Sequence, residues 1–309
     1  MRQPLLYNKV GLKDKKERKS IMYPYIELGI VKIPTYLLMF LIGFVIMIFW
    51  ARKLAPKYNY PKEDIFYVSL YAAIGILIGA KIMYFVSKLP VIITKFDAYI
   101  ELWKLSPADA INFSFGGLVF YGGLIGAVIG AYIYCRQFKM PFSPLMDIFA
   151  PLIPFVHGMG RIGCFLAGCC YGKEYHGFGS VQYPANELID ALDDVPRVPV
   201  QLIEAGLNFI ITAVLVMIMY KCKLKVGQLL GIYIVYYTVI RFLMEMLRGD
   251  AIRGNVGGVS TSQIISIVLI PIGLVLLRGK WLERRLTKKA TSAVDGEIEV
   301  NGDNDKESK

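Results

Sequence analysis

The chain has 309 residues, of which 55% are hydrophobic and 19% are charged, and its formal net charge is +11. So high an apolar fraction argues against a water-soluble protein. The positive charge fits the anionic inner face of a membrane at least as well as it fits nucleic acid. Because the charge is placed in loops between apolar segments, we expect no nucleic-acid partner.

The chain begins with a basic N-terminal segment, residues 1–22. Its first 21 residues contain seven lysines or arginines and no apolar stretch, so they do not resemble a secretory signal peptide. Met22 is followed by Tyr-Pro-Tyr-Ile-Glu-Leu-Gly, which would make a natural start of the mature protein. We therefore expect that translation begins at Met22 and that the basic residues before it are not translated.

Seven apolar segments follow, and each is long enough to be a membrane-spanning helix, which needs roughly 20 mostly apolar residues. They are residues 33–51, 65–87, 111–135, 148–172, 201–220, 226–247 and 254–277. The predicted fold is all-α: a polytopic integral membrane protein with about seven transmembrane helices in one domain, residues 23–286. The polar composition of residues 287–309 predicts a disordered tail.

Basic residues are concentrated in alternate loops. Loops 52–64, 136–147 and 221–225 and the stretch after residue 277 are rich in lysine and arginine, and the loops between them are sparser. The positive-inside rule then predicts an external N-terminus and a cytoplasmic C-terminus. The basic residues 1–21 would contradict this orientation if they were present.

Two arginines, Arg161 and Arg241, lie inside predicted spans. At about 1.5 Å per residue, both lie roughly 20 Å from the cytoplasmic ends of their helices, and Lys81 lies slightly further. A charge at membrane depth costs several kcal/mol and is usually functional. Arginine also binds phosphate through a planar fork of donors. The two arginines therefore predict a site for a lipid phosphate.

Other polar groups fall in the same outer half of the bilayer. Tyr36, Tyr121 and Glu204 lie in the first turns of helices that are predicted to start outside. A site there would face lipids of the outer leaflet and substrates that emerge on the external face of a bacterial cytoplasmic, or inner, membrane.

Four polar residues of the sixth segment share one helix face. Tyr237, Arg241, Glu245 and Arg248 follow the spacing i, i+4, i+8 and i+11. The functional interpretation makes this face part of a binding site. The structural alternative is an internal ion pair between Arg241 and Glu245 that only holds the bundle together.

Arg161 has small neighbours. Gly160 and Gly163 allow a close backbone approach, and Pro151 and Pro154 upstream favour a bent or interrupted helix. The alternative is a snorkelling arginine, which its depth would strain. By contrast, Gly122, Gly126 and Gly130 form a small-residue ladder that favours plain helix packing.

The five cysteines, Cys135, Cys164, Cys169, Cys170 and Cys222, suggest no disulfide framework. Cys164 and Cys169 have loose zinc spacing, and His157 lies nearby, but there is no second cysteine pair. Small thiols that fill helix contacts are the commoner case. We expect neither a cofactor nor a metal.

The chain resembles the bacterial prolipoprotein diacylglyceryl transferases over about residues 25–250. The main marks are Gly-Arg-x-Gly-x-Phe-x-x-Gly from Gly160 to Gly168, followed by Gly172, and Tyr-x-x-x-Arg-x-x-x-Glu-x-x-Arg from Tyr237 to Arg248. Shorter tracts at residues 79–84, 120–126 and 199–204 and a first-helix tyrosine, Tyr36, are also similar. The chain departs from the family pattern at Tyr121 (usually His), at Cys164, Ala167 and Cys169 (often Asn, Asn and Glu) and at Lys81 (Arg).

The resemblance implies transfer of diacylglycerol from phosphatidylglycerol to the lipobox cysteine of a prolipoprotein signal peptide, with release of glycerol phosphate. The implied catalytic residues are Arg161, Arg241, Tyr121 and Glu245. The implied contacts to phosphatidylglycerol, the signal peptide or membrane lipids are Tyr36, Lys81, Gly122, Gly123, Gly160, Gly163, Cys164, Gly172, Gln201, Glu204, Tyr237 and Arg248. Tyr121 could accept the thiol proton only if its pKa were far below the usual value of about 10. Two alternatives stay open: the chain has no dedicated base, or Cys164 takes the place of one.

Three alternatives remain open. The departures at Tyr121, Cys164 and Cys169 motivate a related transferase with a different acceptor. A lipid or anion transporter would use the intramembrane arginines to bind its substrate, but no inverted repeat is evident in the segments. A thiol or metal oxidoreductase would rest on the cysteines alone.

Overall fold

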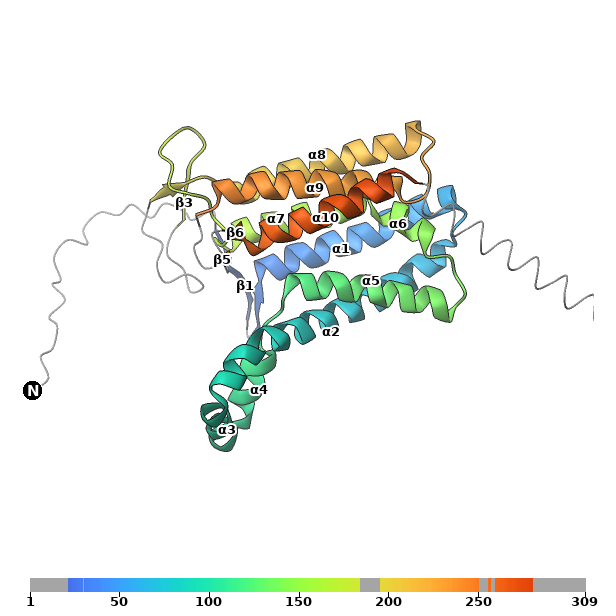
Figure 1. Cartoon of the computed structure of the whole chain (residues 1–309). Helices are drawn as coiled ribbons and strands as arrows, with labels where there is room; N and C mark the ends of the chain where they lie inside the picture. Colours follow the sequence, from blue (N-terminus) through green and yellow to red (C-terminus); the bar gives the residue numbers. More distant parts are fainter. Residues whose placement is uncertain (1–21, 30, 184–194, 250–254, 257–258, 280–309) are drawn as a thin grey trace, which may run out of the picture.

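A computed structural model describes residues 22–29, 31–183, 195–249, 255–256 and 259–279, and these are mostly helical (Figure 1). The predictions for the start of translation and for the tail therefore lie outside the described residues. The long helices lie side by side in one bundle: α1 (Thr35–Leu54), α2 (Lys62–Thr94), α5 (Phe120–Gln137), α7 (Leu152–Leu166), α8 (Val200–Lys221), α9 (Gln228–Leu247) and α10 (Thr261–Leu277). The shorter helices are η1 (Ala55–Tyr58), α3 (Phe96–Leu105), α4 (Pro107–Phe115) and α6 (Ser143–Phe149).

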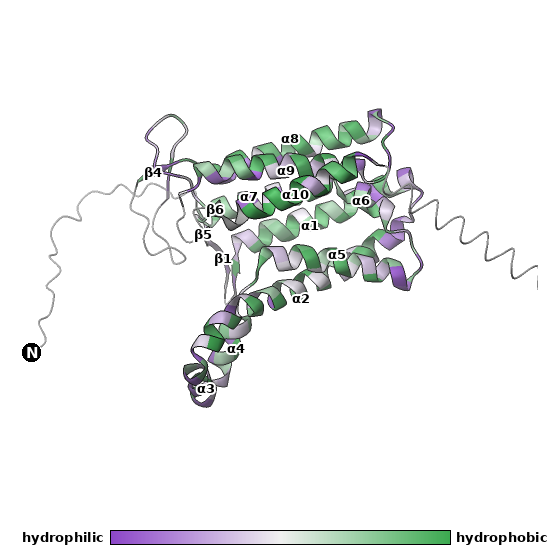
Figure 2. Ribbon diagram, in the orientation of Figure 1, coloured by the Kyte–Doolittle hydropathy of each residue, from purple (hydrophilic) through white to green (hydrophobic). Residues whose placement is uncertain are grey.

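The helices have the length and composition of a membrane protein. Within the described residues, four are long and apolar enough to cross a bilayer: Thr35–Tyr58, Lys62–Thr94, Val200–Lys221 and Gln228–Leu247. Two bent pairs, α4 with α5 and α6 with α7, raise this number to six if each pair is one span, and residues Gln263–Leu277 form a shorter apolar helix. Hydrophobic residues dominate the helices, and hydrophilic ones gather at the ends of the bundle (Figure 2). The prediction of an all-α membrane protein is confirmed at this level.

Two predicted spans are divided in the structure, and two others differ in length: the segment 65–87 is part of the longer α2, and the segment 254–277 becomes helical only at Thr261. The segment 111–135 is not one helix, because α4 ends at Phe115 and α5 starts at Phe120 at an angle of 76° to it. A Cβ on Gly117 would lie 2.2 Å from the ring of Tyr84, so the connection depends on glycine. The segment 148–172 is also divided, because Pro151 separates α6 from α7 with a bend of 43°. A proline there cannot continue the backbone hydrogen bonds of a helix.

The helices α2 and α5 meet along a seam of glycines, which we call the glycine seam: Gly75 and Gly79 on α2 and Gly122, Gly126 and Gly130 on α5. A Cβ on Gly126 would lie 2.0 Å from the carbonyl oxygen of Gly75, and one on Gly122 would lie 2.3 Å from that of Gly79. The backbones are therefore in direct contact, as in small-residue helix pairs of membranes. The packing interpretation of the glycine ladder is confirmed.

One end of the bundle holds most of the fully buried apolar side chains. Ile65, Ile148, Leu152, Leu215 and Leu229 are 0–1% exposed there. On the outside of the bundle, large apolar side chains are exposed instead, such as Leu77 at 60% and Ile210 at 62%. Such a surface would be unusual on a soluble monomer and is suited to lipid.

Three short antiparallel hairpins lie at the other end, which the all-α prediction did not include. They are β1 (Tyr25–Leu28) with β2 (Val31–Pro34), β3 (Val181–Gln182) with β4 (Pro196–Arg197), and β5 (Asn255–Val256) with β6 (Val259–Ser260). The chain enters α1 and α8 and leaves α7 and α9 at this end, which we call the hairpin end (Figure 1). The last part of α2, with α3 and α4, projects from the bundle on the same side (Figure 1).

Candidate active site

Five charged side chains from three helices meet near the hairpin end. Arg161 of α7 forms an ion pair through Nε with Oε2 of Glu204 on α8. The other carboxylate oxygen of Glu204 lies 3.7 Å from Nη1 of Arg241 and 3.9 Å from Nη1 of Arg248. Nη2 of Arg241 lies 2.6 Å from Oε2 of Glu245. We call these five residues the arginine–glutamate cluster.

The cluster is buried. The side chain of Arg161 is 13% exposed, those of Arg241 and Arg248 are 6% and 3%, and that of Glu204 is 4%. Removing a charge from water costs several kcal/mol, so each arginine requires a nearby anion. The carboxylate of Glu204 is an anion near all three arginines, so Glu204 is the centre of the cluster. The sequence did not indicate this role.

The spacing of the residues explains the cluster. Tyr237, Arg241, Glu245 and Arg248 share one face of α9, and the Arg241–Glu245 pair has the expected i, i+4 spacing. The Arg241–Glu245 ion pair, which the sequence analysis gave as a purely structural alternative, is therefore present. However, Arg241 also faces Glu204 of another helix, so its position does not depend on that pair alone.

His157 joins the cluster one turn before Arg161 on α7. Its Nε2 accepts a hydrogen bond from Nε of Arg161 at 3.3 Å, and its ring lies 5.9 Å from that of Tyr237. The sequence interpretation considered His157 only as part of a metal cluster. Its i−4 position relative to a buried arginine was the signal that could have placed it here.

A small pocket adjoins the cluster. His157, Glu204, Tyr237 and Arg241 line it together with Asn208, Tyr236 and Ile240. Within the part of the chain that the structure describes, Nη1 of Arg241 is a buried donor without a hydrogen-bond partner. Three arginines against two glutamates also leave the cluster with a formal charge of 3 − 2 = +1. The pocket thus has a donor and a charge suited to an anion.

Gln201 is fully buried beneath the cluster, one turn before Glu204 on α8. Its Oε1 accepts a hydrogen bond from the hydroxyl of Tyr183 at 3.0 Å, and its Nε2 donates to the carbonyl of Cys169 at 2.7 Å. Burial raises the pKa of Tyr183 to about 12, so this hydroxyl keeps the proton that it donates. In this structure Gln201 links α8 to the loop after α7.

The predicted glycines have different surroundings. A Cβ on Gly163 would lie 2.7 Å from the Cα of Tyr36, so this glycine lets α1 and α7 come together at the predicted first-helix tyrosine. Gly172 packs against the carbonyl of Val198 and pairs with Arg248 in an isolated β-bridge. A Cβ built on Gly160 would meet no heavy atom of the described residues within 4 Å, apart from its chain neighbours and the backbone of its own helix.

The structure does not bring the other predicted site residues into the arginine–glutamate cluster. Nζ of Lys81 donates to the carbonyl of Phe115, at the end of α4. Gly122 and Gly123 are buried against α2. Tyr121 is half-buried beside Phe120, whose ring lies 6.5 Å from that of His157, and it interacts electrostatically with Tyr237 of the pocket, so it borders the site.

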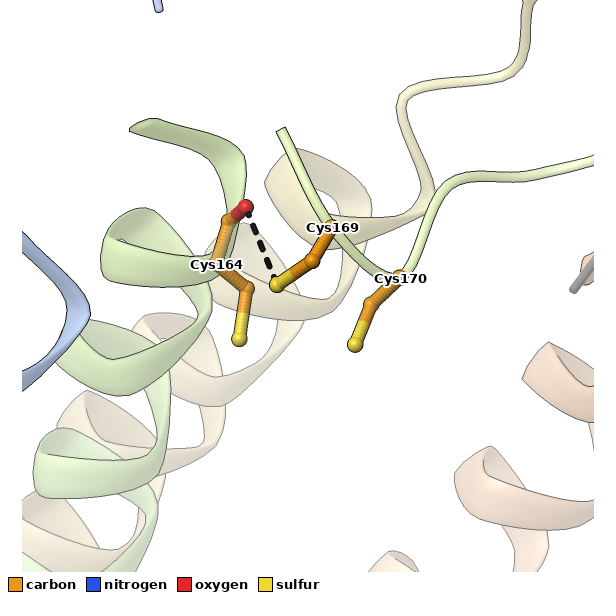
Figure 3. Close-up of side chains that lie close together, drawn as sticks. All are labelled: Cys164, Cys169 and Cys170. Atoms are coloured by element: carbon orange, nitrogen blue, oxygen red, sulfur yellow. Dashed lines mark hydrogen bonds between the residues drawn. The ribbon is translucent and has the colours of Figure 1, made fainter. Parts of the chain in front are cut away.

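Three sulfur atoms converge where α7 ends. Sγ of Cys164, Cys169 and Cys170 all lie within 4.8 Å of one another and point into a common space (Figure 3). All three residues are half-buried, and none of the five cysteines is in a disulfide. They face one another, so the expectation that these thiols merely fill helix contacts does not describe them. Among the residues that the structure describes, this thiol cluster is the group that could hold a metal ion.

Comparison with known proteins gives consistent results. The family model described as prolipoprotein diacylglyceryl transferase matches residues 24–278. The phosphatidylglycerol–prolipoprotein diacylglyceryl transferase of Clostridium tetani is 32% identical over 248 residues, which cover 80% of this chain and 93% of the relative. A second enzyme of that name from Clostridium perfringens is 32% identical over 82% of this chain and 94% of its own length. One from Legionella pneumophila is 29% identical over 86% of this chain and its own full length.

Proposed function

This chain belongs to the prolipoprotein diacylglyceryl transferase family, and we propose on that premise that the arginine–glutamate cluster is its catalytic site. The protein is a transferase that moves the diacylglyceryl group of phosphatidylglycerol to a prolipoprotein. We further propose that the acceptor is the lipobox cysteine of the signal peptide and that glycerol phosphate leaves. The observation that carries the assignment is the convergence of three buried arginines on Glu204.

The reaction breaks the bond between a glycerol carbon and a phosphate oxygen, so negative charge grows on the leaving phosphate. Guanidinium groups already oriented in a site without water stabilise such charge strongly. Arg241 is proposed to bind the phosphate through the Nη1 that has no hydrogen-bond partner in the described chain. Glu245, 2.6 Å from Nη2, holds the guanidinium in place.

Arg161 is proposed to be the second phosphate ligand. Its Nε is held by Glu204 and His157, which leaves both Nη groups to be directed to a substrate. Arg248 adds a third positive charge at the end of α9. Tyr237, which lines the pocket, and Tyr36, at the α1–α7 contact, are proposed contacts of the headgroup and the signal peptide.

The role of several other predicted residues is indirect in this proposal. Gln201 and Gly172 support the loop between α7 and α8, and Gly163 supports the close approach of α1 and α7. Tyr121 borders the site, but within the described residues no hydrogen bond to a base supports its use as a proton acceptor. The thiol cluster at Cys164 is considered separately below.

We also propose a position in the membrane. The basic loops 52–64, 136–147 and 221–225 lie at the end of the bundle opposite the hairpins (Figure 1). The positive-inside rule assigns that end to the cytoplasm. With seven spans, counting the bent pairs and α10, the N-terminus is external, the C-terminus is cytoplasmic, and the cluster opens to the outer leaflet of the cytoplasmic membrane.

The test is mass spectrometry of a lipobox peptide after incubation with phosphatidylglycerol vesicles and the purified protein. We expect a diacylglyceryl mass gain on the peptide cysteine, no gain when the cysteine is replaced by serine, and no gain with Arg161→Ala. A folded protein that binds phosphatidylglycerol but leaves the peptide unmodified would contradict the proposal and favour a different acceptor.

A further inference from the structure

We propose that Cys164, Cys169 and Cys170 bind a zinc ion whose fourth coordination position takes the thiol of the acceptor peptide. This inference rests on the proposed transferase function. It assigns the activation of the thiol to a metal held by the three cysteines and not to a side chain acting as a base.

The distances suit a zinc–thiolate site. With Zn–S bonds of about 2.3 Å, two sulfurs of a tetrahedral site lie about 3.8 Å apart. The three sulfurs of the thiol cluster lie within 4.8 Å of one another, so each pair needs to close by at most about 1 Å. Three protein ligands with one open position are the usual arrangement of a catalytic zinc, whereas structural zinc sites are closed by four.

The backbone is shaped to bring the sulfurs together. Gly168 and Cys170 both have positive φ, 73° and 64°, on either side of Cys169. A positive φ is unfavourable for a residue with a side chain, so Cys170 holds this conformation against a local cost. In an extended chain, adjacent side chains would point to opposite sides. The turn instead directs Cys169 and Cys170 toward the same space as Cys164 (Figure 3).

The loop is also held from outside. The carbonyl of Cys169 accepts the amide of the fully buried Gln201, and its Sγ donates to the carbonyl of Cys164 at 3.6 Å. Tyr183 in turn fixes Gln201. Hydrogen bonds that orient the residues around a metal are a regular feature of metal sites. Here they form a chain from the hairpin to the thiol cluster.

The thiol cluster adjoins the arginine–glutamate cluster. Cys164 follows Arg161 by three residues on α7 and thus lies on the same helix face. Arg248 pairs through its backbone with Gly172, two residues after Cys170, so a second arginine of the cluster lies near the thiols. Nearby positive charge favours thiolates, which are the form that binds a metal.

The two adjacent clusters suit the two reacting groups: the thiol cluster suits the acceptor thiol, and the arginines suit the leaving phosphate. On binding zinc, the acceptor thiol loses its proton to water and becomes a bound thiolate. The sulfur attacks the glycerol carbon of phosphatidylglycerol, a C–S bond forms, and the C–O bond to the phosphate breaks. The electron pair goes to the phosphate oxygen beside the arginines, and glycerol phosphate leaves. The product thioether is uncharged, so it is a weaker ligand than the thiolate and can depart.

The nearby bases are otherwise engaged. Glu204 and Glu245 are paired with arginines, and Nε2 of His157 accepts from Arg161. A metal would therefore supply the deprotonation for which these groups are poorly placed.

The first experiment loads the full-length protein with Co²⁺ in detergent under reducing conditions. We expect one ion per chain and the sulfur-to-metal absorption of a tetrahedral thiolate site, both lost in Cys164→Ser and Cys169→Ser. Cys135→Ser and Cys222→Ser should bind as the unmodified protein does. Cys170→His should retain the ion with a shifted spectrum, which shows that a loss in the serine variants is not a loss of folding. Wild-type protein without this absorption would overturn the site.

The second experiment probes the open position without turnover. A lipobox peptide added in the absence of phosphatidylglycerol should change the Co²⁺ spectrum, and the same peptide with serine in place of cysteine should not. An unchanged spectrum with the cysteine peptide would overturn the proposed use of the fourth position.

The third experiment separates this inference from the proposed function. Removing the metal should lower the transfer rate at least about 100-fold, the scale of a lost proton-transfer catalyst, and zinc should restore it. Transfer at the full rate without metal would overturn the zinc inference and leave the transferase function intact. If the spectra behave as expected but zinc-loaded protein transfers nothing, the proposed function fails while the metal site stands.

Discussion

The arginine–glutamate cluster and the glycine seam both carry residues that resemble the same family, yet they are built in opposite ways. In the cluster, five long charged side chains from three helices meet within a buried volume. In the seam, side chains are absent and the backbones of α2 and α5 touch. Burying the charged cluster costs free energy, and Nη1 of Arg241 has no hydrogen-bond partner in the described chain. The glycine seam is filled by backbone atoms and presents no polar side chain to a substrate.

A residue in a family motif can therefore serve helix packing or the chemistry of the site. Gly122 and Gly123 lie in a tract similar to the family, but their surroundings are other helix atoms. Arg161 and Arg241 lie in similar tracts and face a pocket or its charged wall. A motif residue therefore has a chemical role only where the structure leaves its polar atoms available, and substitutions should divide along that line.

The largest effect is expected from Glu204→Gln, which removes the shared anion from three arginines. Leaving a buried charge without its partner costs about 3–5 kcal/mol, so the free energy of unfolding in detergent micelles should fall by about that amount. Glu27→Gln is the matched control, because Glu27 pairs with Lys32 at the surface, where it is 66% exposed, and the change should be negligible. Equal stability of both variants would mean that Glu204 is not the centre of the cluster.

Arg241→Ala should lower the rate of diacylglyceryl transfer. Removing one preoriented donor to a developing oxyanion typically lowers the rate about 100- to 1,000-fold, and we expect that loss in the peptide transfer assay. Arg241→Lys should retain part of the rate, since lysine keeps the charge but not the planar fork. Arg136→Ala, at the exposed C-terminal end of α5, should transfer normally. A normal rate for Arg241→Ala would exclude this residue from phosphate binding.

Gly126→Ala tests the seam by adding one methyl group 2.0 Å from a carbonyl oxygen. Overpacking of this kind costs about 1–3 kcal/mol, so unfolding should become easier while the rate per folded molecule is kept. Gly206→Ala on α8 is the control, because its Cβ would meet no heavy atom of the described residues within 4 Å beyond its neighbours and the backbone of its own helix. If Gly126→Ala instead lowered the transfer rate at full stability, the seam would belong to the site.

The smallest effect is expected from Lys81→Met. Its Nζ holds the carbonyl at the end of α4, and one such exposed hydrogen bond contributes about 1 kcal/mol. We expect that loss of stability and an unchanged apparent affinity for phosphatidylglycerol, measured as KM. Lys104→Met on α3 should change neither quantity. A raised KM with Lys81→Met would restore the sequence-based expectation that Lys81 contacts the lipid.

Much of this arrangement could be predicted because residue number in an α-helix determines position along the helix axis, and hence depth in the bundle. The rise per residue places Arg161 near the end of α7, Glu204 near the start of α8 and Arg241 near the end of α9, which all lie at the hairpin end. The i, i+4 and i+11 spacing on α9 likewise predicts the face that Arg241, Glu245 and Arg248 share. The position of a residue along the helix axis and the face on which it lies both follow from its number within a single helix.

What could not be predicted depends on contacts between helices or on single dihedral angles. The connection after α4 packs Gly117 against the ring of Tyr84 on another helix, and the central position of Glu204 depends on arginines of two other helices. Hairpins of two to four residues per strand are too short to show a period. The convergence of the thiols requires a left-handed Cys170, a conformation that the residue type does not favour.

The position of Glu204 has a consequence for turnover. Because the carboxylate of Glu204 already lies among the three arginines, a phosphate bound there under the proposed function would compete with an internal anion. The exchange weakens ground-state affinity, but tight ground-state binding by itself does not speed the chemical step. When glycerol phosphate is ready to leave, the same carboxylate can return and compete for the arginines. Under the proposed function, this competition for the arginines would favour the release of glycerol phosphate, a step that is often slow in enzymes.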